Sequence, residues 1–133
     1  MDVRWGYNNV QIKKGDEWKA AFKTNKGLFE PTVMFFGMCN SPATFQGMMD
    51  TIFVDMIEGC IVIIYIDDIL IFARNQEDLE RYTKLVLQQL RENNLFLKAF
   101  KCEFNKTRIE YLGMIVEEGK NSMDPIKLGG IRD

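Results

Sequence analysis

The stretch that decides the fold reads Cys60-Ile61-Val62-Ile63-Ile64-Tyr65-Ile66-Asp67-Asp68-Ile69-Leu70-Ile71-Phe72-Ala73. Two apolar runs rich in β-branched residues flank an adjacent pair of carboxylates. Each run is too short for a helix of normal length, so the pattern predicts two buried strands. Because Asp tolerates turn conformations, we expect a β-hairpin with Asp67 and Asp68 at its tip.

The adjacent carboxylates of Asp67 and Asp68 need a positive charge nearby. Their negative charges repel, and partial desolvation on an apolar hairpin makes the repulsion stronger. A divalent cation or a basic side chain would offset it, and Mg²⁺ is the hard cation that suits carboxylate oxygens best. The same dipeptide is also common in simple solvated turns. From this stretch alone, a metal site and a plain charged turn both stay open.

Length and composition indicate one globular domain. With 133 residues, of which 47% are hydrophobic and 27% charged, the chain can bury a sizeable core. The net charge of −2 gives no global basic signature of nucleic-acid binding. The sequence has no histidine, which excludes histidine-based catalysis and histidine metal ligands.

Cysteines and apolar runs bear on the cellular compartment. Cys39, Cys60 and Cys102 are odd in number and lack metal-type spacing, so we expect buried, reduced thiols in an intracellular protein. The first residues show no signal-peptide pattern. The longest apolar run, residues 61–66, is far too short to span a bilayer, and we expect no membrane partner.

Before the central stretch, the chain begins with predicted extended structure. Alternating apolar residues around Val10 predict a short strand. Residues 18–24 and 28–35 predict the two arms of a hairpin, with Gly27 in its turn. Pro31 removes a ladder donor from the second arm, so we expect an edge strand or a broken one there.

A helix is predicted to follow this hairpin. Ser41 is its expected N-cap, Pro42 its first helical residue and Gly59 its C-cap. Apolar side chains recur along it at helical spacing and predict a stripe that faces the core: Phe45, Met48, Met49, Ile52, Phe53 and Met56.

Beyond the central stretch, the sequence predicts one more helix and several strands. Asn75 is the expected N-cap of the helix, and Asn93-Asn94 its end. Its apolar face would carry Leu79, Tyr82, Val86 and Leu90. Strands are predicted at residues 95–99, 108–116 and 120–123, with a turn at Glu118-Gly119 and a break at Asp124-Pro125. The fold class that follows is α+β, with antiparallel hairpins covered by two amphipathic helices in two layers.

Tyr65-Ile66-Asp67-Asp68 between two strands resembles the Tyr-x-Asp-Asp box of reverse transcriptases, and residues 69–73 resemble the gypsy-type LTR retrotransposon branch. Blocks that resemble this family follow its order along nearly the whole chain: Asp2-Val3-Arg4-x-Gly6-Tyr7, Lys19-Ala20-Ala21-Phe22-x-Thr24, Gly27-x-Phe29-Glu30, residues 33–46, Lys101-Cys102-Glu103-Phe104, Tyr111-Leu112-Gly113 and Met123-Asp124-Pro125. One block is weak evidence, whereas six at the family's spacing are strong, counting residues 19–24 and 27–30 together as one hairpin block. Departures from the branch include Trp5, Asn8, Asn9 and Phe35, and none of them removes a metal ligand.

The resemblance implies a polymerase palm, with an antiparallel sheet, two packed helices and a finger-side β-hairpin. It implies an RNA-directed DNA polymerase, a nucleotidyltransferase that joins a dNTP to a primer 3′-hydroxyl with two Mg²⁺ ions, for which Mn²⁺ can substitute. Asp2, Asp67 and Asp68 are the implied catalytic metal ligands, together with the backbone of Val3. Without the resemblance, Asp2 would be expected to fray. Lys101 is the implied proton donor to pyrophosphate, although a lone lysine in a polar loop is more often simply solvated.

The resemblance also implies binding residues. The nucleotide pocket would hold Tyr7, Phe36, Gly37, Tyr65 and Ile66. The primer backbone would meet Tyr111, Leu112 and Gly113. Plainer explanations remain open, since Tyr7 can be an ordinary half-buried tyrosine and Gly113 can mark a bend in a strand.

Five lysines gather around the first predicted hairpin: Lys13, Lys14, Lys19, Lys23 and Lys26. They could meet the phosphates of a template. Lysines on an edge hairpin also serve to block aggregation, and this second explanation stays open.

We expect residues 1–133 to be a reverse transcriptase domain fragment, a palm with partial fingers that is truncated at both ends. The implied partners are an RNA or DNA template with primer, dNTPs, and the remaining fingers, thumb, connection and RNase H domains of the same polyprotein. The isolated chain should be weak or inactive, because positioning of the duplex supplies much of the rate. In a live element it would reside in a cytoplasmic virus-like particle. Two alternatives stay open: a non-catalytic remnant with at most weak metal or nucleic-acid binding, and another palm-type nucleotidyl transferase or cyclase.

Overall fold

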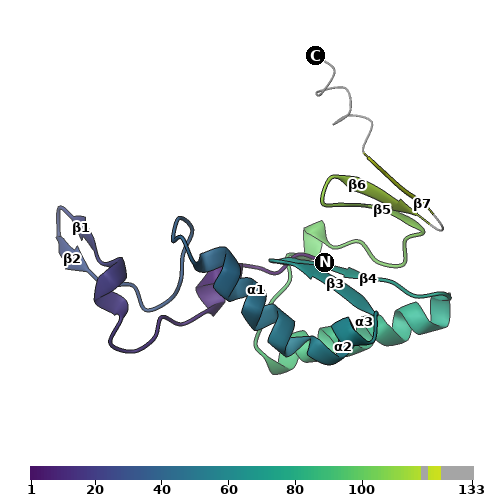
Figure 1. Ribbon diagram of the computed structural model, residues 1–133, viewed down its shortest axis with the longest axis horizontal. Coiled ribbons are helices and arrows are strands. Elements are labelled where there is room, and N and C mark those ends of the chain that lie inside the picture. Colours follow the sequence, from purple (N-terminus) through teal and green to yellow (C-terminus); the bar gives the residue numbers. More distant parts are fainter. Residues whose placement is uncertain (118–119, 124–133) are drawn as a thin grey trace, which may run out of the picture.

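The structure, a computed structural model, describes residues 1–117 and 120–123, the last four by their backbone. The described chain has an α+β fold (Figure 1) with helices α1 (Ser41–Ile52), α2 (Val54–Glu58) and α3 (Gln76–Glu92). Its strands pair as β1 (Phe22–Thr24) with β2 (Gly27–Phe29), β3 (Val62–Tyr65) with β4 (Asp68–Ile71), and β5 (Arg108–Tyr111) with β6 (Met114–Glu117) and β7 (Lys120–Met123). The predicted class is confirmed, and all pairing is antiparallel.

The β3–β4 hairpin is the middle of the fold. The three helices lie on one side of it and the β5–β6–β7 sheet on the other (Figure 1). Val62 of β3 and Ile69 of β4 are buried, as expected for strands in an apolar run. The buried core is formed by side chains from the first residues of the chain, from the helical segments, from the central hairpin and from the segment after α3. These are Val3, Phe45, Met49, Phe53, Val62, Ile69, Val86, Leu90 and Leu95.

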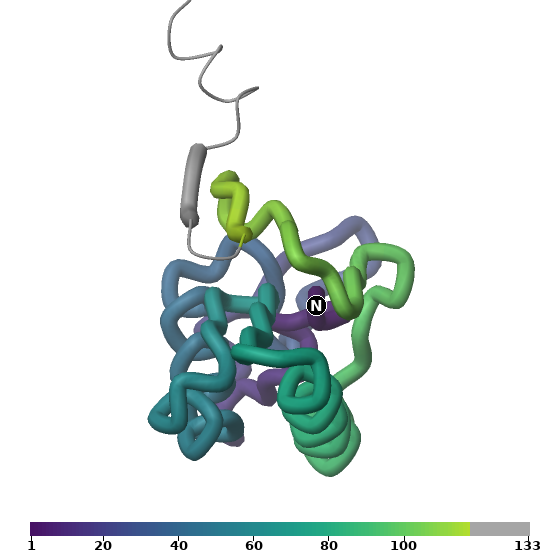
Figure 2. Tube along the Cα trace, turned by 90° about the vertical axis from the view of Figure 1, so that its right-hand side faces the viewer, coloured from purple at the N-terminus to yellow at the C-terminus, as the bar shows by residue number. Residues whose placement is uncertain are grey.

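The first residues of the chain run between the central hairpin and the segment after α3 (Figure 2). Asp2 forms an antiparallel bridge with Asp68, and Val3 forms another with Leu97. The Val3 side chain is fully buried. The start of the chain is therefore fixed from both sides, and Asp2 is not frayed.

The first predicted helix differs from the observed one at its start and in its middle. Asn40 is the N-cap and Ser41 already belongs to α1, so the predicted N-cap is wrong. The Ser41 hydroxyl donates to the Phe35 carbonyl at 3.0 Å. The helix is interrupted at Phe53, and the predicted C-cap Gly59 ends the short α2 that follows.

The first predicted hairpin is confirmed at its tip, with shorter arms than expected. Residues Glu17–Ala20 form a 3₁₀ helix in place of a strand, closed by the Lys19 N–H that donates to Asp16 O. Strand β2 ends at Phe29, ahead of Pro31, as expected for a broken arm. All residues of β1 and β2 are exposed, so these strands have no buried face that would extend them.

The second half follows the prediction more closely. Asn75 caps α3 by accepting the Asp78 N–H at 2.8 Å, as predicted. The predicted strand at residues 95–99 is reduced to the Leu97 bridge and then a 3₁₀ helix, Ala99–Lys101.

The predicted strand 108–116 is two strands in the structure. Positive φ values of 52° at Leu112 and 77° at Gly113 form a tight turn that divides it into β5 and β6. The backbone of β7 confirms the strand at 120–123. The expected turn at Glu118-Gly119 and the break at Asp124-Pro125 lie outside the described residues.

The cysteines are free, but their expected burial is wrong. Cys39 and Cys60 are exposed, and Cys102 is partly exposed. Cys39 and Cys60 lie in turns that border helices, outside the core. Among the described residues, no helix combines the length and apolar character needed to cross a membrane.

Candidate metal centre

Backbone pairing on both sides holds Asp2 beside the tip of the central hairpin. The Val3 N–H donates to Asp67 O at 2.8 Å, and the Ile69 N–H donates to Met1 O at 2.7 Å. On the opposite side, the Lys98 N–H donates to Asp2 O at 2.9 Å. Asp2 and Asp68 therefore form a non-hydrogen-bonded antiparallel pair, the kind in which facing side chains come closest.

Three carboxylates converge at this point. Asp2, Asp67 and Asp68 each offer an oxygen, and these oxygens lie within 4.8 Å of one another. All three side chains are half-buried. The turn itself consists of Ile66 and Asp67, while Asp68 begins β4 opposite Tyr65. Of the two acids predicted at the hairpin tip, Asp67 lies in the turn and Asp68 begins the strand. The carboxylates of both lie close to that of Asp2.

The negative charge of this cluster is incompletely compensated. Burial raises the pKa of the Asp67 carboxyl above its ordinary value, and the Asp2 carboxylate raises it further. Burial and the Asp2 charge likewise raise the pKa of Asp68. Oδ1 of Asp2 is buried and accepts no hydrogen bond from the described part of the chain. A cluster of hard oxygen atoms with unsatisfied acceptors fits a divalent cation.

Two lysines face Asp2. Lys98 Nζ lies 3.6 Å from Oδ1 and Lys101 Nζ lies 3.7 Å from Oδ2, both too long for hydrogen bonds. Lys101 was singled out from the sequence, and its ammonium does reach the cluster. Lys98 was missed, because its place opposite Asp2 depends on pairing between segments far apart in the chain.

Two of the aromatic residues predicted for the nucleotide pocket contact each other in the structure. The Tyr7 and Phe36 rings pack edge to face with centroids 4.8 Å apart. Tyr7 also packs on the buried Phe45 at 5.8 Å. Phe36 is 83% exposed, and Gly37 follows it in a turn with φ 95°. Tyr7 therefore contacts the core through Phe45, while Phe36 on its other side is open to solvent.

Two further residues shape the site and were not assigned from the sequence. A Cβ atom on Gly6 would lie 3.1 Å from the Phe45 ring and 3.5 Å from Cβ of Asp67, so a larger residue would require the buried Phe45 ring to shift. Gln46 of α1 bonds to the backbone at Ile66, whose φ is 54°. Both residues lie inside blocks that resemble the family, Gly6 in Asp2-Val3-Arg4-x-Gly6-Tyr7 and Gln46 at the end of residues 33–46, but neither was assigned a role from the sequence.

Tyr111, predicted to meet a primer, contacts the central hairpin. Its hydroxyl lies 3.1 Å from Asp68 O and 3.4 Å from Ile63 O, and donates to these carbonyls. Burial, with the Asp68 charge as a second cause, raises the pKa of Tyr111 to about 12. The hydroxyl therefore stays protonated and joins β5 to the metal-site hairpin. Leu112 and Gly113 form the turn just beyond it.

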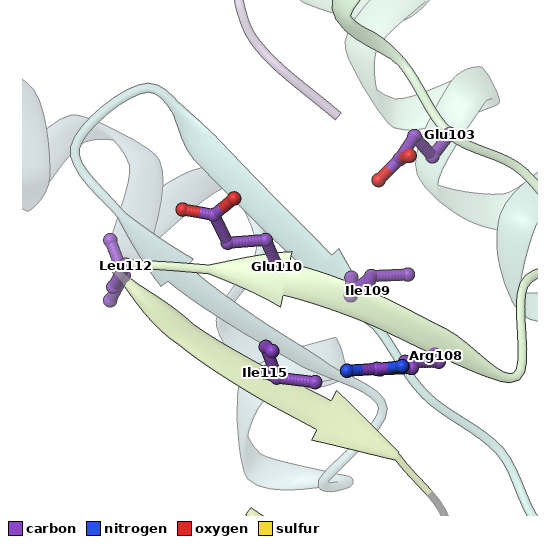
Figure 3. Close-up of a pocket in the computed structure, with 6 residues that line it drawn as sticks. All are labelled: Glu103, Arg108, Ile109, Glu110, Leu112 and Ile115. Carbon is purple, nitrogen blue, oxygen red and sulfur yellow. The ribbon is translucent and has the colours of Figure 1, made fainter. Parts of the chain in front are cut away.

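A cleft extends from the carboxylates along the β5–β6 hairpin. Its inner part, about 240 Å³, is lined by residues that include Asp2, Asp68, Lys101 and Tyr111. Its outer part, about 490 Å³, is open and lined by Glu103, Arg108, Ile109, Glu110, Leu112 and Ile115 (Figure 3). The turn residue Leu112 lines both parts.

The five lysines of the first hairpin lie apart from this cleft. The β1–β2 hairpin projects from the rest of the molecule (Figure 1), and all five lysines are exposed. Lys19 pairs with Asp16 at 2.8 Å. Their exposure fits either of the two explanations drawn from the sequence.

The sequence of this chain matches a family model and several known proteins. A family model described as "Reverse transcriptase (RNA-dependent DNA polymerase)" matches residues 1–116. The Transposon Tf2-3 and Tf2-7 polyproteins of Schizosaccharomyces pombe are 36% and 35% identical over 118 residues. These matches cover 89% of this chain and 9% of each polyprotein. The chain therefore spans a small part of the relatives it matches.

Solved structures share the fold. The foamy viral protease-reverse transcriptase in complex with RNA/DNA hybrid superposes with a TM-score of 0.86 at 19% identity, covering 99% of this chain and 18% of that chain. The same viral protein in complex with dsDNA gives a TM-score of 0.86 at 19% identity, covering 100% of this chain and 27% of that chain. At this level of identity the likeness concerns the fold.

Proposed function

Since this chain belongs to the reverse transcriptase family, we propose that it forms the catalytic palm, with part of the fingers, of an RNA-directed DNA polymerase from a gypsy-type LTR retrotransposon polyprotein. The observation that carries the proposal is the convergence of Asp2, Asp67 and Asp68 within 4.8 Å. These three carboxylates come from two segments more than 60 residues apart, and backbone pairing holds them together. A plain solvated turn would need no such third acid.

Reverse transcriptases use divalent metal ions, and the cluster fits such an ion. We assign Mg²⁺ as the ion, bound as a pair by Asp2, Asp67 and Asp68, with Mn²⁺ as a substitute. The Val3 carbonyl, which accepts no hydrogen bond from the described residues, would complete the ligand set. When bound, the ions activate the primer 3′-hydroxyl and stabilise the charge on the leaving pyrophosphate. The chain's own part is to hold the carboxylates in fixed positions on paired strands.

The other site residues take the roles that their positions support. Tyr7 and Phe36, with Gly37, Tyr65 and Ile66, would border the incoming nucleotide, since Tyr7 contacts Phe36 and directly follows Gly6, which passes close to Asp67. Lys101 would donate a proton to pyrophosphate, because its ammonium lies 3.7 Å from a metal-ligand oxygen and is more than half exposed.

The partners proposed for this chain are an RNA or DNA template with its primer, and dNTPs. The foamy viral neighbours, solved with RNA/DNA hybrid and dsDNA, support nucleic acid as the partner. Leu112 and Gly113 would meet the primer backbone, since the turn they form borders the cleft. The remaining fingers, thumb, connection and RNase H domains of the polyprotein would grip the duplex, in a cytoplasmic virus-like particle.

Primer extension tests the proposed activity. On an RNA template with Mg²⁺ or Mn²⁺ at high protein concentration, the chain should add nucleotides slowly, because most of the duplex grip lies in other domains. Asp67→Asn should abolish the product, whereas Asp55→Asn, a control at an exposed acid of α2, should keep it. Product formation that survives Asp67→Asn would contradict the assignment. A wild-type chain that makes no product would show that the isolated chain is not an autonomous polymerase.

A further inference from the structure

The turn that presents Asp67 is conformationally costly. Its first residue, Ile66, has φ 54°, in the left-handed region that a β-branched side chain rarely enters. Ile66 is also half-buried against the core, so packing ties this position to an apolar side chain. A conformation of this kind persists where the surroundings hold it in place. The backbone of Ile66 therefore needs an external support.

Gln46 supplies such a support from the facing helix. Its Oε1 accepts the Ile66 N–H at 2.5 Å, and its Nε2 donates to Ile64 O at 3.3 Å. One amide group thus bonds the strand end and the turn of the catalytic hairpin. Gln46 is 18 residues from Ile64 and 20 residues from Ile66 in the sequence, so the two bonds join separate elements.

The orientation of this amide follows from the chemistry of its third partner. Nε2 also lies 2.8 Å from Oδ1 of Asp50, one turn further along α1. An ionised carboxylate can only accept, so the NH₂ end must face Asp50, and the oxygen must face the Ile66 N–H. Asp50 therefore selects the orientation in which Gln46 can hold the turn.

The helix that carries Gln46 is itself fixed. Phe45 and Met49, its neighbours along α1, are fully buried, and Phe45 also contacts Tyr7. A side chain on a rigid, buried helix can hold its partner in place more accurately than one on a loop. The support for the turn thus comes from the core.

We propose that Gln46 is a positioning residue of the metal centre: its amide, oriented by Asp50, holds the Ile66 turn so that Asp67 and Asp68 face Asp2. The inference rests on the proposed function of the three carboxylates as a metal site. Gln46 itself touches none of the carboxylates of that site and acts through the backbone of the hairpin.

Hydrogen exchange at the Ile66 amide, followed by NMR on the full chain, tests the bond directly. Gln46→Met keeps the length of the side chain and removes both hydrogen-bonding ends. The Ile66 amide should then exchange at least about tenfold faster, because it opens without unfolding of the sheet. Gln88→Met on α3 is the matched control, since it also removes a glutamine that bonds to an acid one turn away, Glu92 at 2.9 Å.

Metal affinity tests the positioning role. Titration with Mn²⁺ should show that Gln46→Met weakens binding about 10- to 100-fold, the usual effect of losing a residue that orients metal ligands. The double variant Gln46→Glu/Asp50→Asn exchanges donor and acceptor at unchanged net charge. Its Glu carboxylate can accept from both the Asn amide and the Ile66 N–H, so it should restore Ile66 protection. Because a carboxylate cannot donate to Ile64 O, only part of the Mn²⁺ affinity should return.

The outcomes separate this proposal from the function it rests on. Slow Ile66 exchange in Gln46→Met, or fast exchange with unchanged Mn²⁺ affinity, would overturn the positioning role. Failure of the double variant to restore Ile66 protection would also count against it. Asp67→Asn should lose Mn²⁺ binding while Ile66 stays protected. If the wild-type chain bound no Mn²⁺ at all, the metal site and with it the positioning role would fall, even if the Gln46 bond itself were seen by exchange.

Discussion

At the scale of single residues, folding brings like charges together at Asp2, Asp67 and Asp68. Asp67 and Asp68 have raised pKa values because they are partly buried, with Asp2 as the second cause. Lys98 and Lys101 approach Asp2 at distances too long for hydrogen bonds. Without a metal ion, the arrangement should therefore cost stability.

Asp67→Asn should stabilise the metal-free protein near neutral pH. A carboxyl whose pKa is raised by folding binds its proton more tightly in the folded chain, so stability falls as pH rises through that pKa. The variant removes this loss, and in EDTA at about pH 7 its melting temperature should be higher by a few degrees. At about pH 3, below the ordinary Asp pKa of 3.8, the difference should vanish.

Circular dichroism across this pH range provides the measurement. Asp55→Asn serves again as the control, because Asp55 lies exposed on α2, away from the cluster. A lower melting temperature for Asp67→Asn at neutral pH would show that the charge of Asp67 is already compensated in the metal-free chain.

At the scale of elements, the sequence predicted those helix ends and turns that depend on neighbouring residues alone. Asn75 caps α3 through a side chain three residues away from its donor, and the sequence showed it. The turn at Leu112 was missed, because leucine at a positive φ is not a turn signal and Gly113 alone was compatible with a bend. Ser41 was misplaced by one position, because the helix already begins there and Asn40 is its N-cap.

Leu112→Asn should stabilise the β5–β6 hairpin. Both residues of this two-residue turn have positive φ, the pattern for which Asn-Gly is preferred. Leu112 is 51% exposed, so little burial is lost, and the protein should gain about 1 kcal/mol in the free energy of unfolding. Urea denaturation measures this gain. Leu87→Asn, at an exposed leucine of α3, should bring no gain, and equal effects at both positions would refute the turn explanation.

At the scale of the whole molecule, the site is assembled from segments that the sequence does not show to be neighbours. The family's blocks identified Asp2, Asp67, Asp68 and Lys101, and the sequence alone explained the hairpin between β3 and β4. The bonds of Gln46 to Ile66, of Lys98 to Asp2 and of Tyr111 to Asp68 join elements through space. No local pattern encodes such contacts, because each depends on how the layers pack.

Asp2 decides the central claim, because the hairpin acids alone could belong to a charged turn. Electron paramagnetic resonance of Mn²⁺ titrated into the full chain measures binding without requiring turnover. The wild-type protein and Asp55→Asn should bind Mn²⁺ equally, and Asp2→Asn should bind at least about tenfold more weakly, because it removes a ligand. Equal Mn²⁺ affinity for wild type and Asp2→Asn would contradict the three-carboxylate metal centre.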